Sequence, residues 1–120
     1  MFDHVGLRVR DIDASARFYR AALGALGHEA GVNEPAVVGI GPPGAPALWL
    51  YADERMAHSL LHLAFRAPSR AAVEAFHRAG LAAGGRDNGA PGVRADYAPD
   101  YYAAFLLDPD GNNLEAVCQR

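Results

Sequence analysis

Apolar residues along the chain follow two periods, one typical of strands and one typical of helices. In residues 2–9 (FDHVGLRV) they alternate with polar or small residues, and residues 59–65 (SLLHLAF) form an apolar run of strand length. In residues 14–27 (ASARFYRAALGALG) they recur three or four positions apart, which indicates a helix packed on a sheet. Residues 70–80 (RAAVEAFHRAG) form a second candidate helix.

Both candidate helices begin after residues that cap helices well. Asp11 or Asp13 precedes the first helix, and Ser69 precedes the second. Such side chains accept a hydrogen bond from a backbone N–H group of the first turn. Gly24 and Gly80 suit the helix ends. Each candidate strand is therefore followed by a helix.

Shorter strand-like segments follow each helix. They are residues 35–41 (PAVVGIG) and 47–52 (ALWLYA) in the first half, and residues 101–107 (YYAAFLL) and 112–118 (NNLEAVC) in the second. Proline and glycine in GPPGAP and GGRDNGAPG mark connections between strands, and we expect the second stretch to be a mobile loop. Each half is therefore predicted to have the order βαβββ.

The two halves are related by an internal repeat. When the chain is shifted by 58 positions, which is 62 minus 4, His4 falls on His62 and eight further identities follow without a gap. By chance, this Ala-rich composition would give about two or three. The repeat predicts one α+β domain over residues 1–120, built from two modules at about 1–55 and 56–120.

Composition and charge exclude several classes of protein. The net charge is -3, the pI is about 5.9 and the positive charges are scattered, so a nucleic-acid partner is not expected. No apolar stretch approaches the roughly 18 residues of a membrane span. Cys118 is the only cysteine and no secretory signal is recognisable, which predicts a cytoplasmic protein. A small molecule is the expected partner.

The repeat places two histidines, His4 and His62, on equivalent faces of equivalent strands, so their imidazoles can converge. Glu115 in the last strand points away from Leu114 and Ala116 and offers a carboxylate. Two imidazoles and one carboxylate on one side of a divalent ion leave coordination positions open for water or substrate. The sequence therefore predicts a catalytic metal site, without distinguishing Zn, Ni, Mn or Fe(II).

Three stretches resemble the vicinal oxygen chelate superfamily, which includes glyoxalase I, extradiol dioxygenases and the fosfomycin and bleomycin resistance proteins. They are DHVGLRVRDIDASARFYRAALG, HLAFRAPSRAAVEAFH and YYAAFLLDPDGNNLEAV. The resemblance covers essentially the whole chain. It implies two βαβββ modules that form a cupped mixed sheet around a central metal cavity, with His4, His62 and Glu115 as ligands.

The resemblance departs from glyoxalase I at one ligand. Glyoxalase I has a fourth ligand, a glutamate, at the place that the repeat aligns opposite Glu115, and this chain has Trp49 there. Tryptophan cannot coordinate the metal. The departure weakens assignment as a lactoylglutathione lyase and favours three-ligand branches such as thiol transferases and extradiol dioxygenases.

Further residues are expected around the metal. If the turn spans residues 108–112, Phe105 faces Glu115 and Tyr101 shares the cavity side, whereas a shift of one residue would place Tyr102 there. A tyrosine could stabilise an oxyanion or act as an acid. Substrate contacts are expected from aromatic residues and one arginine that could bind an anionic group: Trp49, Tyr51, Phe105 and Arg94.

Two functions follow from these expectations. The first is a metal-dependent enzyme, a lyase, isomerase, thiol transferase or ring-cleaving dioxygenase, that acts on a small oxygen-chelating substrate. The alternative is a binding protein that resembles bleomycin resistance proteins and sequesters a compound without catalysis. The modules could pair within one chain or across two copies, and we expect a homodimer.

Overall fold

The computed structural model describes residues 1–57 and 59–120. The first module contains β1 (Val5–Val9), α1 (Ile12–Gly24), β2 (Glu29–Glu34), β3 (Val37–Gly41) and β4 (Leu48–Ala52). The second contains β5 (His62–Arg66), α2 (Arg70–Ala82), β6 (Arg86–Val93), β7 (Tyr101–Leu107) and β8 (Asn113–Gln119). The order βαβββ occurs twice, as the repeat predicts.

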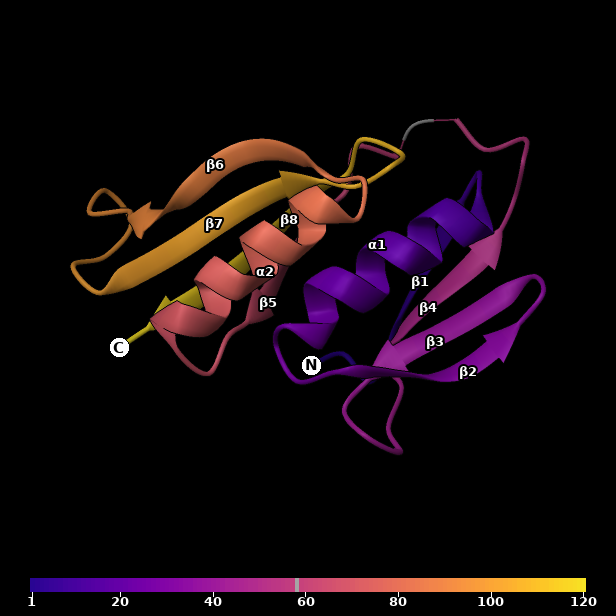
Figure 1. Cartoon of the computed structure of the whole chain (residues 1–120), viewed down its shortest axis with the longest axis horizontal. Helices are drawn as coiled ribbons and strands as arrows, with labels where there is room; N and C mark the ends of the chain where they lie inside the picture. Colours follow the sequence, from indigo (N-terminus) through magenta and orange to yellow (C-terminus); the bar gives the residue numbers. More distant parts are fainter. Residues whose placement is uncertain (58) are drawn as a thin grey trace.

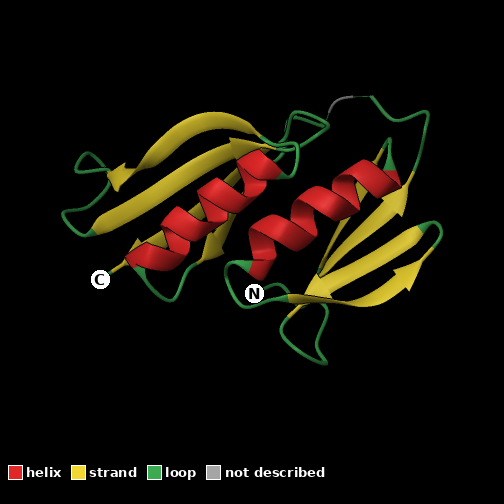
Figure 2. Cartoon of the chain, viewed as in Figure 1, coloured by secondary structure: helices red, strands yellow, loops and turns green. Residues whose placement is uncertain are grey.

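The two modules form sheets of the same topology. Sheet A has the strand order β1-β4-β3-β2 and sheet B has the order β5-β8-β7-β6. In each sheet the first and last strands of the module pair in parallel, and the other neighbours pair antiparallel. One helix packs against each sheet (Figure 2). The predicted α+β fold of two βαβββ modules is confirmed.

Both helices begin at predicted caps. Asp11 accepts a hydrogen bond from the backbone N–H of Ala14, and Ser69 accepts one from Ala72. These side chains satisfy donors that have no partner inside the helix. In α1 the apolar residues that recur at helical spacing are buried or half-buried, while Arg17 and Arg20 are exposed.

The end of α2 differs from the prediction. Gly80 does not end the helix, which continues to Ala82. A Cβ atom at Gly80 would lie 2.3 Å from Leu106 Cδ1 and 3.2 Å from a ring carbon of Phe18, which lies on α1. Glycine occupies this position because α2 approaches both β7 and α1 closely there. Close packing, rather than helix termination, explains the residue.

The two helices pack side by side in the middle of the molecule, and sheets A and B lie on either side of them (Figure 1). The core includes Phe18 of α1 and Phe76 of α2, both fully buried. β1 and β5 are outer strands of two separate sheets. In this arrangement the cupped sheet expected from the resemblance is not closed within one chain.

Each sheet has one face packed on its helix and one turned away from it. We call the second face the open face. On sheet A it carries Gly6, Gly39 and Trp49, because Leu7 and Leu50 next to them in sequence belong to the core. On sheet B the alternation of β5, β7 and β8 assigns the open face in the same way.

The stretch GGRDNGAPG contains a strand rather than the predicted mobile loop, because β6 runs from Arg86 to Val93 and pairs with β7. Its register shifts between Asp87 and Gly89 and again between Gly89 and Gly92. Gly89 has φ 151°, a conformation that favours glycine. An irregular outer strand tolerates glycine and proline, which is why composition alone indicated a loop.

The other predicted strands occur close to their expected places, and GPPGAP lies in the connection between β3 and β4. β2, with the polar sequence EAGVNE, has no counterpart among the strand segments located from the sequence. In residues 1–57 and 59–120, no helix has both the length and the apolar character needed to cross a membrane.

Candidate metal centre

Glu115 lies in the middle of β8, between Phe105 of β7 and Ala64 of β5 in register. This is the predicted pairing of Glu115 with Phe105. The glutamate is on the open face of sheet B, since its neighbours Leu114 and Ala116 are in the core. Only 3% of its surface is exposed. A carboxylate this deeply buried requires polar or charged partners.

The turn between β7 and β8 fixes this register. Oδ1 of Asp108 accepts hydrogen bonds from the backbone N–H groups of Asp110, at 2.9 Å, and Asn112, at 2.8 Å. Gly111 has φ 89°, which favours glycine at this point of the turn. The turn is therefore held by its own side chain, and β8 leaves it with Glu115 on the open face.

His62 begins β5 and lies beside Glu115. Its Nδ1 atom is 3.2 Å from the carbonyl oxygen of Asn113, and its Nε2 atom is 3.1 Å from Oε2 of Glu115. A carbonyl oxygen only accepts, so Nδ1 carries the hydrogen and donates it. The neutral imidazole then directs the lone pair of Nε2 toward the carboxylate. A second proton on the imidazole, or a cation between the two side chains, makes this contact favourable.

The contact between His62 and Glu115 has the geometry of two ligands of one ion. Bonds of about 2.1 Å at right angles place two donor atoms about 3 Å apart. A hydrogen bond from the other imidazole nitrogen to a backbone carbonyl is the usual way in which a metal-binding histidine is oriented. These two side chains therefore fit a divalent metal, with Nε2 and Oε2 as the donor atoms.

Tyr101 holds the second oxygen of Glu115. Its hydroxyl group donates a hydrogen bond of 2.5 Å to Oε1, which leaves Oε2 turned toward His62. Partial burial, together with the hydrogen bond to Glu115, raises the pKa of Tyr101 to about 12. The phenol is therefore protonated at neutral pH and acts as a donor. The ring of Tyr97 packs edge-on against Tyr101, with ring centres 5.2 Å apart.

Tyr102 lies on the other face of sheet B. Its hydroxyl group donates to Glu74 of α2, and the Arg70 guanidinium lies 4.9 Å from its ring centre. The shifted register that would have placed Tyr102 beside the predicted metal is therefore not the one adopted. Because side chains alternate along β7, Tyr101 lies on the same face as Glu115 and Tyr102 does not.

Phe105 and Arg94 extend the site along the open face of sheet B. The ring of Phe105 is stacked near the imidazole of His62, with centres 6.4 Å apart and planes 22° from parallel. The guanidinium of Arg94 lies 5.4 Å from the Phe105 ring centre and donates to the carbonyl oxygens of Gly92, at 2.9 Å, and Ala90, at 2.7 Å. Arg94 follows β6, and its guanidinium is held beside Phe105 by these two hydrogen bonds.

A hollow of about 450 Å³ continues the same face beyond Glu115. It is lined by residues that include Ala64 and Arg66 of β5 and Val117 and Gln119 of β8. Ala64, one of the lining residues, is paired with Glu115 in register. Its volume is in the range of sites for small ligands.

The remaining predicted site residues belong to the first module. His4 precedes β1, its Nδ1 atom is 2.8 Å from Asp3, and its side chain is 58% exposed. Trp49 and Tyr51 lie in β4, on the open face of sheet A. Across the described ranges, no three His, Cys, Asp or Glu side chains are grouped so that they could hold a metal ion. One chain thus brings together His62 and Glu115 but not His4.

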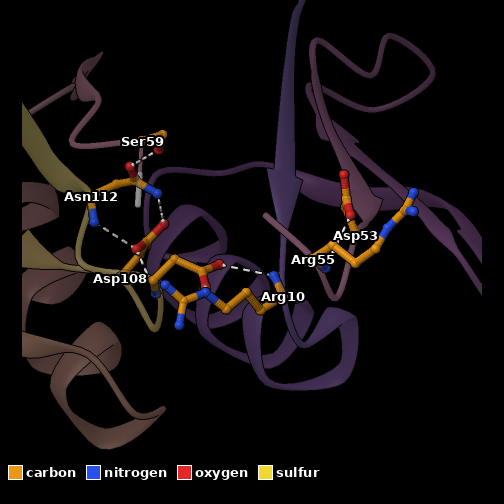
Figure 3. Close-up of polar contacts among 7 residues, drawn as sticks. Arg10, Asp53, Arg55, Ser59, Asp108 and Asn112 are labelled. Carbon is orange, nitrogen blue, oxygen red and sulfur yellow. Dashed lines mark hydrogen bonds and ion pairs between the residues drawn. The ribbon is translucent and has the colours of Figure 1, made fainter. Parts of the chain in front are cut away.

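Sequence reasoning did not identify the support behind His62. The side-chain oxygen of Asn112 accepts a hydrogen bond from the hydroxyl group of Ser59 (Figure 3). The same oxygen accepts one from the backbone N–H of Leu61, at 3.0 Å. Leu61 immediately precedes His62, so the turn that positions Glu115 also positions the histidine. Three polar side chains within five residues of the turn were the available signal for this role.

The same turn contacts the first module. Oδ2 of Asp108 accepts a hydrogen bond of 2.6 Å from the hydroxyl group of Tyr19 on α1. Burial and the neighbouring Asp108 carboxylate raise the pKa of Tyr19 well above its usual value. The backbone N–H of Arg10 donates to Asp110 at 3.4 Å (Figure 3). Buried polar contacts therefore join the two modules through this turn.

The fold described above is that of a known superfamily. Residues 1–116 match the family described as the Glyoxalase/Bleomycin resistance protein/Dioxygenase superfamily, and the chain belongs to it. The superfamily includes enzymes such as lactoylglutathione lyase. No curated protein matches the chain.

Solved structures agree with this assignment. A glyoxalase/bleomycin resistance protein from Albidiferax ferrireducens T118 is 35% identical, with a TM-score of 0.82, and the match covers 98% of this chain and 97% of the other. A family enzyme from Burkholderia phytofirmans PsJN is 22% identical, with a TM-score of 0.75 and coverage of 98% of each chain. Lactoylglutathione lyase from Agrobacterium tumefaciens is 22% identical, with a TM-score of 0.68 and coverage of 98% and 91%. The last two likenesses show the fold alone.

Proposed function

We propose that this protein is a divalent-metal-dependent enzyme that acts on a small substrate through two neighbouring oxygen atoms of that substrate. The observation that carries the proposal is the contact between His62 Nε2 and Glu115 Oε2 at 3.1 Å. The hydrogen bond from Nδ1 of His62 to a carbonyl oxygen leaves Nε2 free to bind a cation. Reactions of the lyase, isomerase, thiol transferase or ring-cleaving dioxygenase type are all compatible with such a centre.

A bound divalent metal would supply Lewis acidity, which stabilises negative charge that develops on substrate oxygen. The chain's own residues hold the reacting groups in place. Tyr101 fixes the orientation of the Glu115 carboxylate, because its single hydroxyl hydrogen is donated to Oε1. Arg94 offers a fixed positive charge to an anionic group of the substrate.

The proposed enzyme is a homodimer in which His4 of a second copy completes the metal centre. Three features support this arrangement. The open faces of both sheets are free within one chain, β1 and β5 are outer strands available to a neighbour, and the His4 side chain is 58% exposed. A twofold pair of chains would place the open face of sheet A against that of sheet B twice, and so form two equivalent sites.

Zinc binding to His62→Ala tests the proposed metal centre. Loss of a ligand should weaken affinity by more than the roughly 10- to 100-fold typical of losing a partner that only orients a ligand. His77→Ala is a matched control, because His77 also contacts a carboxylate, that of Asp87 at 2.8 Å, but does so between α2 and β6. Calorimetric titration with folded, metal-free protein measures both.

The control should bind zinc as the unaltered chain does. Equal zinc affinity in His62→Ala and the unaltered protein would overturn the proposal. Tight binding of a small molecule that a chelator does not weaken, in a protein without zinc affinity, would instead favour the sequestering role.

A further inference from the structure

The indole of Trp49 lies face-on over Gly39 in the neighbouring strand β3. A Cβ atom built at Gly39 would be 2.9 Å from Cζ3 of Trp49 and 3.1 Å from both Cε3 and Cη2. These are three consecutive ring atoms, and near-equal distances to all three arise only when the ring presents its face. An edge-on ring would place the two outer atoms much farther away than the middle one. The indole therefore rests flat on a position that has no side chain.

A second aromatic side chain of β4 leans in the opposite direction. A Cβ atom at Gly6 of β1 would be 3.1 Å from Cε2 of Tyr51. Gly6, Trp49 and Gly39 are aligned across β1, β4 and β3 in register. The two glycines thus leave room for two aromatic rings on the open face of sheet A.

Trp49 is half-buried, and the side of its ring toward Gly39 is covered. The part that remains accessible is therefore turned away from the sheet. Tyr51 is 39% exposed. Flat aromatic surface that is held in place and left open is suited to stacking with a planar conjugated ring, in an offset or edge-to-face arrangement.

We propose that the open face of sheet A is a stacking platform for a planar aromatic ring of the substrate, and that Gly39 determines this specificity by allowing Trp49 to lie flat. The link to catalysis rests on the proposed function, since the platform would face the His62–Glu115 pair only in the proposed dimer. In that dimer, Phe105 on sheet B would offer an aromatic ring on the opposite wall. The preferred substrate is then an aromatic compound with two adjacent oxygens.

A single tryptophan makes the platform directly observable, because the chain gives one indole N–H signal in a nitrogen–proton NMR spectrum. The probes are catechol, which has a ring and two adjacent oxygens, and acetohydroxamate, which has two adjacent oxygens and no ring. Both are added without oxygen to zinc-loaded and to zinc-free protein. Catechol should shift the indole signal in both forms, whereas acetohydroxamate should not.

Gly39→Ala places a methyl group where the indole now rests, so it should reduce the shift caused by catechol and weaken catechol binding about two- to tenfold, the range of an aromatic pair. Gly31→Ala is the matched control in the same sheet, since a Cβ atom there meets nothing within 4 Å. Trp49→Leu, followed by calorimetry, gives a second test if Gly39→Ala does not fold. Acetohydroxamate binding should be unchanged in all three variants.

The two proposals fail in distinguishable ways. If the protein binds zinc, and neither Gly39→Ala nor Trp49→Leu changes its affinity for catechol or for acetohydroxamate, the platform is overturned and the metal centre stands. An indole signal that moves on dilution of the protein but not with catechol would show that Trp49 is a contact between copies, and would also overturn the platform. A shift with catechol in a protein that binds no zinc would support the platform and overturn the metal centre.

Discussion

The open faces of sheets A and B have the same backbone plan and opposite chemistry. On sheet B, Glu115 is held by Tyr101 and His62 in a polar cluster whose members fix one another. On sheet A, the equivalent place carries Trp49, which rests on Gly39 and makes an aromatic surface. One module thus supplies charge and metal-binding atoms, and the other supplies flat apolar surface and an exposed histidine.

The difference shows how a repeated module can divide the work of one site. Neither module by itself supplies all three proposed metal ligands, because the second module contains His62 and Glu115 and the first contains His4. If the two faces meet in a dimer, ligands and aromatic surface lie on opposite walls of one cavity. Substitutions that affect one face and leave the other unchanged therefore test whether the two faces have these separate roles.

The largest effect among these substitutions is expected on sheet B. Tyr101→Phe removes the hydrogen bond to Oε1 of Glu115 and should weaken zinc binding about 10- to 100-fold, as loss of a group that orients a ligand does. Tyr102→Phe is the matched control, because its hydroxyl group bonds to Glu74 on the helix side. Zinc titration of both variants checks this. Similar affinities for the two would mean that Tyr101 does not support the carboxylate.

The next effect is on stability rather than zinc affinity, and it is expected where the helices of the two modules touch. Gly80 and Ala22 are equivalent in the repeat and lie close together, with a Cβ atom at Gly80 only 2.3 Å from Leu106. Gly80→Ala should lower the free energy of unfolding by about 1–3 kcal/mol through overpacking. Gly24→Ala, at an open position of α1, should not destabilise. Urea unfolding measures both, and equal stability of the two variants would contradict the close approach.

The smallest effect is expected in the contact from the turn of sheet B to α1. Tyr19→Phe removes one donor to Asp108, which keeps the backbone donors of its own turn, so the loss of stability should be about 1 kcal/mol. Zinc affinity should remain unchanged, since Asn112 still holds the chain before His62. Thermal unfolding and zinc titration test the two parts. A marked loss of zinc affinity would show that the contact with α1 helps to position the metal ligands.

Local chemistry explains which parts of the fold the sequence predicted. The turn at residues 108–112 determines its own conformation, so the pairing of Phe105 with Glu115 followed correctly. β6 was missed because its glycines and proline indicate a loop by composition, whereas its pairing with β7 depends on the tertiary structure. The repeat matched His4 with His62, but equivalence in sequence does not determine how modules face each other. The packing of α1 on α2, which separates the sheets, depends on distant residues such as Phe18 and Gly80.

The site was predictable to a similar extent. Glu115 and His62 were expected to meet and do so, and Tyr101 was expected on their side of the sheet. The face-on packing of Trp49 over Gly39 could not be predicted, because it depends on the register between β3 and β4. The hydrogen bond that orients His62 is accepted by the backbone carbonyl oxygen of Asn113, and a backbone group carries no sequence signal.

Zinc binding by a mixture of two variants tests most directly whether the metal centre is shared between two chains. His4→Ala and Glu115→Gln each remove one proposed ligand, so neither should bind zinc tightly alone. Unfolded together and refolded as an equal mixture, half of the dimers should contain one copy of each, and one of their two sites would have all three ligands. We predict recovery of about one quarter of the tight sites of the unaltered protein. No recovery, with dimers formed, would contradict a metal centre shared between two chains.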